Sequence, residues 1–314
     1  MAKPFMTYDQ QIEKLKEKLM IINDEEAAKD ILRRYGYFAL ISGYKDLLKN
    51  PTTRNYKDGT TIEDLVAIYH FDEQLRGLTL QYLLHVERHM RSALSYAFCN
   101  TFGDGQAAYL TPQNYDISTQ KKRNAVSKLI NKYLNPLIIA PTKYAYIEHQ
   151  KQQHQNVPLW VLVNALTFGN ISNMYELLKP QTQTAISREF QGIHENQLKQ
   201  ILEVLTDFRN VCAHNERLFT YRCTKHDIPN LPLHHKMQIA KNGQEYISGK
   251  RDYFAVMIAL RYLIPNDEFL SYKQQCSKLI DGLVAKTDKI TEDELLQKLG
   301  FPPNWKKITA YKKC

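Results

Sequence analysis

The chain has 314 residues, of which 43% are hydrophobic and 24% are charged. This balance is typical of a globular protein and excludes a disordered or collagen-like chain. With only 12 Gly and 12 Pro, a mostly helical fold is expected, and the formal net charge of +9 is compatible with a polyanionic partner as well as with an ordinary basic surface.

Cysteine usage and hydropathy bear on the cellular compartment. The five Cys residues are odd in number and widely spaced, which favours free thiols over a disulfide framework. The apolar stretches Leu159–Phe168 and Tyr253–Ile264 are too short to cross a bilayer and predict buried helices. The segment Met1–Asp9 lacks the apolar core of a signal peptide. We therefore expect a cytoplasmic protein without a membrane span.

Residues 1–58 are expected to form an N-terminal helical region. Apolar residues recur at helical spacing from residue 8, and Thr7 or Asp9 is the candidate N-cap of this first helix. A second helix is expected to begin at Asp24 and to run into an aromatic cluster over residues 35–44. Turn residues then end the region.

Residues 59–220 are expected to form the main helical bundle, with inserted loops. An i, i+4 ladder of apolar residues predicts a long helix over residues 61–101, with a break near Arg76–Gly77. Three more helices are expected, over residues 118–133, 159–178 and 196–214. Pro136 and Pro141 are expected to break the helical pattern, and the helix over residues 159–178 is expected to break near Gly169.

Residues 221–314 are expected to form a C-terminal helical region. Its first part, to residue 250, predicts irregular backbone with a hairpin turn at Asn242-Gly243. Two longer helices are then expected, over residues 252–263 and 267–286. A short helix follows, with Thr291 and Glu294 at capping-box spacing and Gly300 as its stop.

The most distinctive motif, Arg209-Asn210-Val211-Cys212-Ala213-His214, ends the helix predicted over residues 196–214. Asn210 and His214 are four residues apart and share a face, whereas Arg209 projects from the apolar stripe. A guanidinium in that position needs a carboxylate partner or lines a cleft that receives an anion. Its planar fork suits phosphate, and a neighbouring imidazole can move protons near neutral pH. The pattern therefore indicates phosphodiester cleavage.

A second constellation lies on the predicted long helix. Glu87 and Arg91 form an i, i+4 pair in the favourable order, and Glu87 lies beside the apolar stripe, where an Arg of another helix could reach it. We therefore expect this helix to pack beside the helix of Arg209. The alternative is purely structural: an exposed salt bridge here, and a core salt bridge plus a helix-capping His at Arg209 and His214. Arg188 and His194 also fit an Arg–His spacing, which we interpret as chance.

Further landmarks are spread over almost the whole chain. In order they are Lys3-Pro4-x-x-Thr7-Tyr8, Tyr35-Gly36-Tyr37-Phe38, Ser42-Gly43-Tyr44, Phe71-Asp72-x-x-Leu75-Arg76, Glu87-x-x-x-Arg91, Arg209-Asn210-x-Cys212-Ala213-His214-x-x-Arg217-Leu218 and Gly300-Phe301-Pro302-x-Asn304-Trp305. Together they resemble the Abi-like (AbiD/AbiF-type) abortive infection proteins, and the Arg–Asn–x–x–x–His pattern resembles the motif of HEPN ribonucleases. Phe219-Thr220 departs from the aromatic–Asn pair that the resemblance leads us to expect.

The resemblance implies an all-α protein, with a HEPN-like helical bundle flanked by N- and C-terminal helical extensions. It implies phage defence by a metal-independent endoribonuclease that uses no cofactor, dimerises to bring two motifs together, and has a small non-coding RNA as a regulatory partner. His214 would be the general acid or base, Arg209 would stabilise the charged phosphorane, and Asn210 would orient His214 or a phosphate oxygen. Glu87 and Arg91 would help to position these catalytic side chains.

Basic side chains outside the motif are candidates for RNA contacts, although solvated charge is the alternative for each. They are Arg88, Lys121, Lys122, Arg123, Arg217, Lys306 and Lys307, with Lys312 and Lys313 in the tail. Two other functions stay open: an RNA-binding regulator with a degenerate site, and a helical adaptor for a phage or host protein. Phosphate-binding Gly-rich loops are absent from the sequence, so ATP- or NAD-dependent chemistry is not expected.

A zinc site is the remaining alternative. Cys212, His214, Cys223, His226, His234 and His235 could supply ligands. Only Cys223-x-x-His226 has a permitted spacing, and no second pair completes a site. No metal site is therefore predicted.

Overall fold

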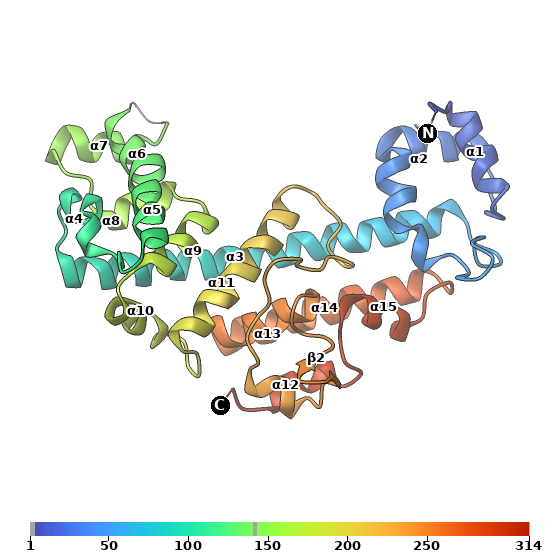
Figure 1. Ribbon diagram of the computed structural model, residues 1–314. Helices are drawn as coiled ribbons and strands as arrows, with labels where there is room; N and C mark the ends of the chain where they lie inside the picture. Colours follow the sequence, from blue (N-terminus) through green and yellow to red (C-terminus); the bar gives the residue numbers. More distant parts are fainter. Residues whose placement is uncertain (1–3, 141–142, 314) are drawn as a thin grey trace.

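One helix of 41 residues, α3 (Ile62–Phe102), organises the fold, which was obtained as a computed structural model that describes residues 4–140 and 143–313. Two lobes stand on the same side of α3, one at each end, while the C-terminal helices lie on its other side (Figure 1). In the described part of the chain the only sheet is a hairpin of β1 (Lys241–Asn242) and β2 (Glu245–Tyr246). The all-α prediction is confirmed, and the predicted hairpin forms with its two-residue turn at Gly243-Gln244, one residue later than expected.

The predicted break of the long helix near Arg76–Gly77 is wrong. Gly77 lies exposed in helical backbone, and a single glycine costs a helix only about 1 kcal/mol relative to alanine. Arg76 and Asp72 bond to each other across this turn, at 2.7 Å, and both are buried. At the start of α3, the Thr61 N–H donates to Asp64 Oδ2 at 2.8 Å and forms half of a capping box. Tertiary packing therefore keeps the backbone helical at Gly77.

The N-terminal lobe stands at the N-terminal end of α3 (Figure 1). Its elements are α1 (Tyr8–Lys16), α2 (Glu25–Tyr35), the π-helix η1 (Phe38–Ser42) and the 3-10 turn η2 (Lys45–Leu47). Thr7, rather than Asp9, caps α1, and Asp24 caps α2 as predicted. The landmark residue Lys3 lies outside the described residues.

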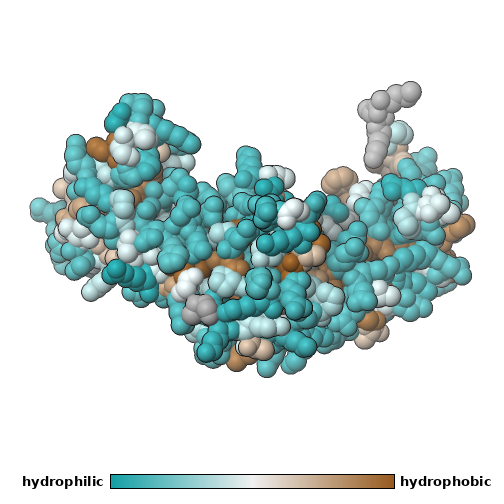
Figure 2. Space-filling model, turned by 60° about the horizontal axis from the view of Figure 1, so that its bottom comes forward, coloured by the Kyte–Doolittle hydropathy of each residue, from teal (hydrophilic) through white to brown (hydrophobic). Residues whose placement is uncertain are grey.

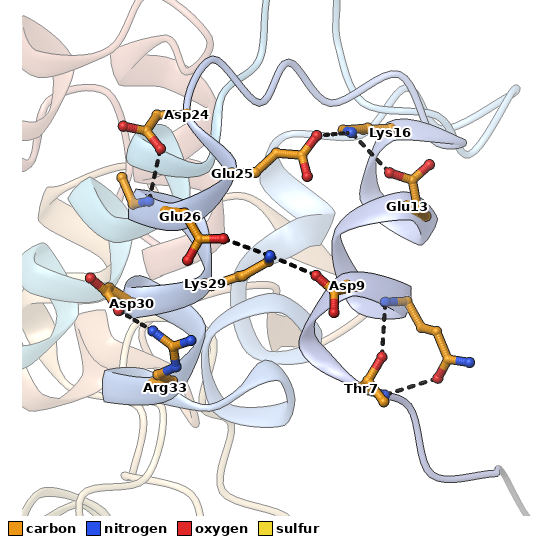
Figure 3. A network of polar contacts seen from close by, with 12 residues as sticks. Thr7, Asp9, Glu13, Lys16, Asp24, Glu25, Glu26, Lys29, Asp30 and Arg33 are labelled. Carbon is orange, nitrogen blue, oxygen red and sulfur yellow. Dashed lines mark hydrogen bonds and ion pairs between the residues drawn. The ribbon is translucent and has the colours of Figure 1, made fainter.

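Ion pairs link α1 to α2 across their solvent side (Figure 3). Lys16 Nζ lies 2.6 Å from Glu25 Oε1, and Lys29 Nζ lies 2.6 Å from Asp9 Oδ1. Exposed pairs of this kind contribute little to stability, so the apolar contacts beneath them hold the two helices together. The buried residues of the two helices are Ile12, Leu15, Ala28 and Leu32.

The second lobe, at the other end of α3, contains many short helices (Figure 1). They are α4 (Gln106–Leu110), η3 (Pro112–Asn114), α5 (Gln120–Lys128), η4 (Leu129–Leu134), α6 (Asn135–Ile139), α7 (Ala145–His154), α8 (Leu159–Leu162), η5 (Val163–Ala165) and α9 (Phe168–Leu177). α10 (Pro180–Ser187) then leads back to the centre.

Of the helix breaks predicted in this lobe, the one at Pro136 is wrong and the one near Gly169 is confirmed, two to three residues before the glycine. Pro136 does not end a helix: it occupies the first turn of α6, where proline is tolerated, and the preceding π-helix η4 keeps the chain helical from Gln120 to Ile139. Gly169 lies inside α9, and the chain breaks just before it, where Thr167 forms a capping box with Asn170. Pro141 lies outside the described residues.

The remaining helices follow α10 along the chain. They are α11 (Glu195–Ala213), α12 (Pro232–Lys236), α13 (Tyr253–Leu263), α14 (Asn266–Lys286), α15 (Glu292–Leu299) and the 3-10 turn η6 (Trp305–Ala310). α11 crosses α3, and α14 and α13 pack against α3 on the side away from the two lobes (Figure 1). The capping box of Thr291 with Glu294 and the left-handed stop at Gly300 are confirmed. The stretch before residue 250 is irregular as predicted, except for α12, which the sequence did not predict.

Buried residues from all three predicted regions join one continuous hydrophobic core. The division into residues 1–58, 59–220 and 221–314 stays a prediction. With the lower side of Figure 1 turned forward, hydrophobic residues form small groups separated by hydrophilic ones (Figure 2). Of the helices that the structure describes, none combines the length and apolar character needed to span a membrane. The four described cysteines are free thiols, and Cys314 lies outside the described residues.

Two glycine substitutions should move stability in opposite directions. Gly77→Ala should stabilise the protein by about 0.5–1 kcal/mol, because a Cβ there meets nothing within 4 Å and alanine favours helix. Gly300→Ala should destabilise it by more than about 1 kcal/mol, because φ is +80° and the new Cβ would lie 2.3 Å from Asp252 Cγ. Thermal unfolding of both variants checks this, and equal shifts would contradict it.

Asp252 should make stability depend on pH. It is the N-cap of α13, and its burial raises the pKa of its carboxyl to about 6, above the roughly 3.9 of an unfolded chain. The folded state then binds the proton more tightly, so the unfolding free energy should fall as pH rises from about 4 to about 6, by on the order of 3 kcal/mol, and level off above. Urea unfolding across this range should show a flatter profile for Asp252→Asn; an unchanged slope would refute the assignment.

Candidate functional site

The sequence motif at the end of α11 lies against the middle of the molecule, where α11 crosses α3 between the two lobes (Figure 1). Arg209 Nε lies 3.7 Å from Oε2 of Glu87 on α3. Glu87 is only 2% exposed and accepts a hydrogen bond from Arg91 Nη2, which also donates to the Leu166 carbonyl at 2.6 Å. The predicted packing of these two helices and the predicted pairing of Glu87 with an Arg of another helix are confirmed.

The contact between Glu87 and Arg209 leaves hydrogen-bonding capacity unused. Glu87 Oε2, Arg91 Nε and Arg209 Nε are buried atoms without a hydrogen-bond partner, and 3.7 Å is too long for a hydrogen bond. Each such atom costs about 1–3 kcal/mol. Two guanidiniums share one carboxylate here, so the cluster carries a net positive charge. It is suited to hold an anion that reaches Arg209, whose side chain is 27% exposed.

Asn210 and His214 lie on the solvent side of the same helix end, and both are exposed. A Schellman motif fixes this end: Asn215 is left-handed with φ 58°, the Glu216 N–H donates to Val211 O at 3.0 Å, and the Asn215 N–H donates to Cys212 O at 3.4 Å. His214 is therefore held as the C-cap of the helix, with its imidazole accessible to a ligand. The end of α11 thus carries a partly exposed guanidinium, Arg209, and an exposed imidazole, His214.

The loop that follows His214 is fastened by a buried carboxylate. Asp72, on α3, accepts hydrogen bonds from the backbone N–H groups of Leu218 and Phe219, at 3.1 and 2.8 Å. It also accepts from Tyr44 Oη at 2.8 Å and from Arg76 Nη1 at 2.7 Å. Burial raises the pKa of the Asp72 carboxyl, while these donors act in the opposite direction. Asp72 on α3 thus contacts both the N-terminal lobe and the loop after the motif, and links these three parts of the structure.

The sequence marked Asp72, Arg76 and Tyr44 as landmarks but assigned them no role. Their convergence depends on segments that lie far apart along the chain, and periodicity alone cannot show it. The available signal was the position of a charged pair, Asp72 and Arg76, on an otherwise apolar helix face. Nothing in the sequence indicated that the backbone carbonyl of Leu166 would accept a hydrogen bond from Arg91.

The structure does not bring the predicted lysines and Arg123 to the end of α11. Lys121, Lys122 and Arg123 lie on α5 in the second lobe, and Lys122 pairs with Asp116. Arg88 lies on α3, and Arg217 follows the motif and donates to the Gly43 carbonyl. The tail residues Lys306, Lys307, Lys312 and Lys313 lie in or after η6, and Lys306 pairs with Asp281 and Glu292 at 3.5 and 3.3 Å.

The side chains considered for zinc are engaged elsewhere. His226 Nδ1 lies 2.9 Å from Asp207 Oδ2, and Nε2 of buried His234 lies 2.8 Å from the Gly249 carbonyl. Burial raises the pKa of the Cys212 thiol to about 12, which keeps it protonated near neutral pH. Over residues 4–140 and 143–313, no three His, Cys, Asp or Glu side chains converge as metal ligands.

Comparison with known proteins identifies the family. The model of a family described as "Abi-like protein" matches residues 30–220, and the chain belongs to that family. The matched span begins in α2 and contains α3, α11 and the loop held by Asp72. This membership suggests abortive infection, a form of phage defence. No curated protein and no solved structure matches the chain.

Removing the Asp72 carboxylate should loosen the loop after the motif. Asp72→Ala leaves Arg76 as an uncompensated buried charge and two backbone N–H groups without an acceptor, so the unfolding free energy should fall by about 3–5 kcal/mol. Tyr44→Phe removes one hydroxyl and should cost about 1 kcal/mol. Urea unfolding measures both values, and hydrogen exchange should show faster exchange of the Leu218 and Phe219 amides.

The matched control is Asp30→Ala, which removes an exposed ion pair with Arg33 on α2. Its effect should stay below about 1 kcal/mol, and exchange of the two loop amides should not change. An Asp72→Ala protein as stable as this control would show that Asp72 is not the anchor.

Proposed function

We propose that this Abi-like protein acts in phage defence as a metal-independent endoribonuclease of the HEPN type. The observation that carries the proposal is the state of Arg209: its guanidinium lies beside a buried carboxylate, its Nε makes no hydrogen bond within the described residues, and it precedes the accessible His214 by little more than one helical turn. A cation available to an anion and a proton carrier at the same helix end are the two groups that cleavage of an RNA phosphodiester requires.

The reaction is a transesterification within the RNA. The ribose 2′-oxygen attacks the adjacent phosphorus as its proton passes to a base, and the bond from phosphorus to the 5′-oxygen of the next nucleotide breaks as that oxygen gains a proton. The products are a 2′,3′-cyclic phosphate and a 5′-hydroxyl. His214 moves these protons, while Arg209 offsets the charge that grows on the non-bridging oxygens. Asn210, on the same face as His214, orients the imidazole or a phosphate oxygen.

Glu87 and Arg91 act as positioning residues in this proposal. Glu87 fixes the direction of the Arg209 side chain, and Arg91 is itself fixed by Glu87 and the Leu166 carbonyl. Because Glu87 neutralises only one of the two guanidiniums, positive charge remains for the substrate. A carboxylate there also keeps Arg209 from pairing with an acid elsewhere when no RNA is bound.

Two copies of the chain are expected to form the complete site. The end of α11 presents one His214, whereas the reaction needs one group to accept a proton and another to donate one. A homodimer that brings two helix ends together would supply both. A small non-coding RNA is the regulatory partner we expect. The mass and the absorbance ratio of the purified complex would report copy number and bound RNA together.

The proposal predicts which variants lose cleavage. His214→Ala should lower the rate on single-stranded RNA at least 100-fold, since general acid–base catalysis contributes about 10²–10⁴. Arg209→Ala should cause a comparable loss. Glu87→Gln should weaken cleavage less, because the amide oxygen can still face Arg209. Mapping of product ends should show cyclic phosphates, and chelators should not change the rate.

His194→Ala is the matched control, because His194 follows Arg188 by six residues, close to the five-residue separation of the motif, and lies at the other end of α11 as its N-cap. Its rate should equal that of the unmodified protein. Cleavage that persists in His214→Ala would refute the assignment. Salt-dependent binding of RNA with no cleavage by the unmodified protein would instead favour a regulator with a degenerate site.

A further inference from the structure

A groove beside the motif has no role in the proposed chemistry. It lies between η1 of the N-terminal lobe and the loop that follows His214, and it encloses about 550 Å³. The first residues after His214 form part of its wall, so the groove is continuous with the end of α11. The lining residues that matter here are Phe38, Tyr44, Tyr69, Asn215, Arg217 and Arg222.

One wall of the groove presents aromatic rings. Phe38 is 85% exposed, although a phenylalanine ring gains free energy from burial. It begins the π-helix η1, a backbone form that often occurs at functional sites. Tyr69, from α3, is half-buried in the same wall, with its ring centroid 5.7 Å from that of buried Tyr44. An exposed ring in a wall with other aromatic side chains offers a stacking surface for a planar ligand.

The loop after α11 adds two guanidiniums to the lining of the groove, Arg217 and Arg222. Arg217 Nη1 donates to the Gly43 carbonyl, and its guanidinium lies 6.0 Å from the centre of the Tyr44 ring. Arg222 donates to the carbonyls of Tyr221 and Lys298, at 2.9 and 2.7 Å. Within the described residues, no carboxylate lies within 4.0 Å of either group.

Carbonyl tethers hold a guanidinium in place without neutralising it, so Arg217 keeps its charge for an anion. Arg222 also interacts electrostatically with the buried carboxylate of Asp252, which offsets part of its charge. Glu216 also lines the groove. Past Arg217 the groove continues between Asp46 and Lys298. Three cations, Arg217, Arg222 and Lys298, therefore face two acids along its length.

We infer that this groove binds a nucleotide of single-stranded RNA next to the bond that is cut, with its base on Phe38 and its phosphate on Arg217. The inference rests on the proposed function for the identity of the neighbouring site. A stacked base requires an unpaired strand, because the bases of a duplex already stack on each other. The groove thus assigns the substrate class as single-stranded RNA and separates base binding from the Arg209–His214 chemistry.

The test uses the full chain carrying His214→Ala, which removes the proposed proton carrier while RNA binding is measured. Anisotropy of a labelled single-stranded oligonucleotide should show about tenfold weaker binding when Phe38→Ala is added, and little loss with Phe38→Trp. Adding Arg217→Ala should reduce the slope of log K against log salt by about 1. A duplex of the same sequence should bind more weakly and should not respond to Phe38→Ala.

The matched control is Tyr96→Ala, which removes another ring that is 75% exposed, on α3 outside this groove. It should leave the affinity unchanged. Because Phe38 is exposed, its loss should not unfold the protein, and thermal unfolding checks this for each variant. An oligonucleotide series with one abasic position should contain a member whose affinity no longer depends on Phe38.

The outcomes separate the two proposals. If the unmodified protein cleaves RNA but Phe38→Ala and Arg217→Ala change neither affinity nor cleavage, the groove assignment is overturned and the ribonuclease proposal stands. If no cleavage occurs but binding depends on Phe38 and on one base, the groove assignment stands and the ribonuclease proposal falls. Competition by a free mononucleotide as strong as by the oligonucleotide would overturn the assignment to an RNA strand.

Discussion

The buried carboxylate of Asp72 is the constraint on which the geometry of this protein depends. It meets one cationic donor, Arg76, one hydroxyl donor, Tyr44, and the backbone N–H groups of Leu218 and Phe219. A charge with no exposure is tolerated only when its acceptor positions are filled, so these segments cannot separate without leaving it uncompensated. Burial of Asp72 is therefore favourable only when the N-terminal lobe and the loop after α11 both pack against α3.

A second buried carboxylate of the same helix, Glu87, imposes the geometry of the candidate site. Asp72 positions the loop after His214, and Glu87 positions Arg209, which precedes His214 by five residues. The end of α11 is thus held from both sides by one continuous α-helix. A rigid element is a precise support for a site, since displacement of either carboxylate would require bending α3. This explains why the helix continues through Gly77: a break there would uncouple the two anchors.

The sequence predicted features that depend on local periodicity and caps, namely the class of the fold, α3, α11, and the pairing of Glu87 with an Arg of another helix. It failed where tertiary context outweighs a local preference. Packing keeps the backbone helical at Gly77. Pro136 lies in the first turn of α6, directly after a π-helix, where its missing N–H costs little. The role of Asp72 could not be predicted, because its acceptor positions are filled by backbone groups 146 residues away, and backbone groups leave no mark in a sequence.

The net charge of +9 suggests a broad basic surface, but the structure shows where charge is available to a ligand. Lys122 and Lys306 are paired with acids, and the lysine-rich tail lies on the other side of α3 from the end of α11. Around the motif, by contrast, guanidiniums are held by one shared carboxylate or by carbonyls. Attraction of a polyanion falls off within about 8 Å in physiological salt, so a few partly compensated arginines near the end of α11 count for more than many distant lysines. The surface that an RNA strand would bind therefore depends on which basic side chains lack a nearby acid, and not on the total charge of the protein.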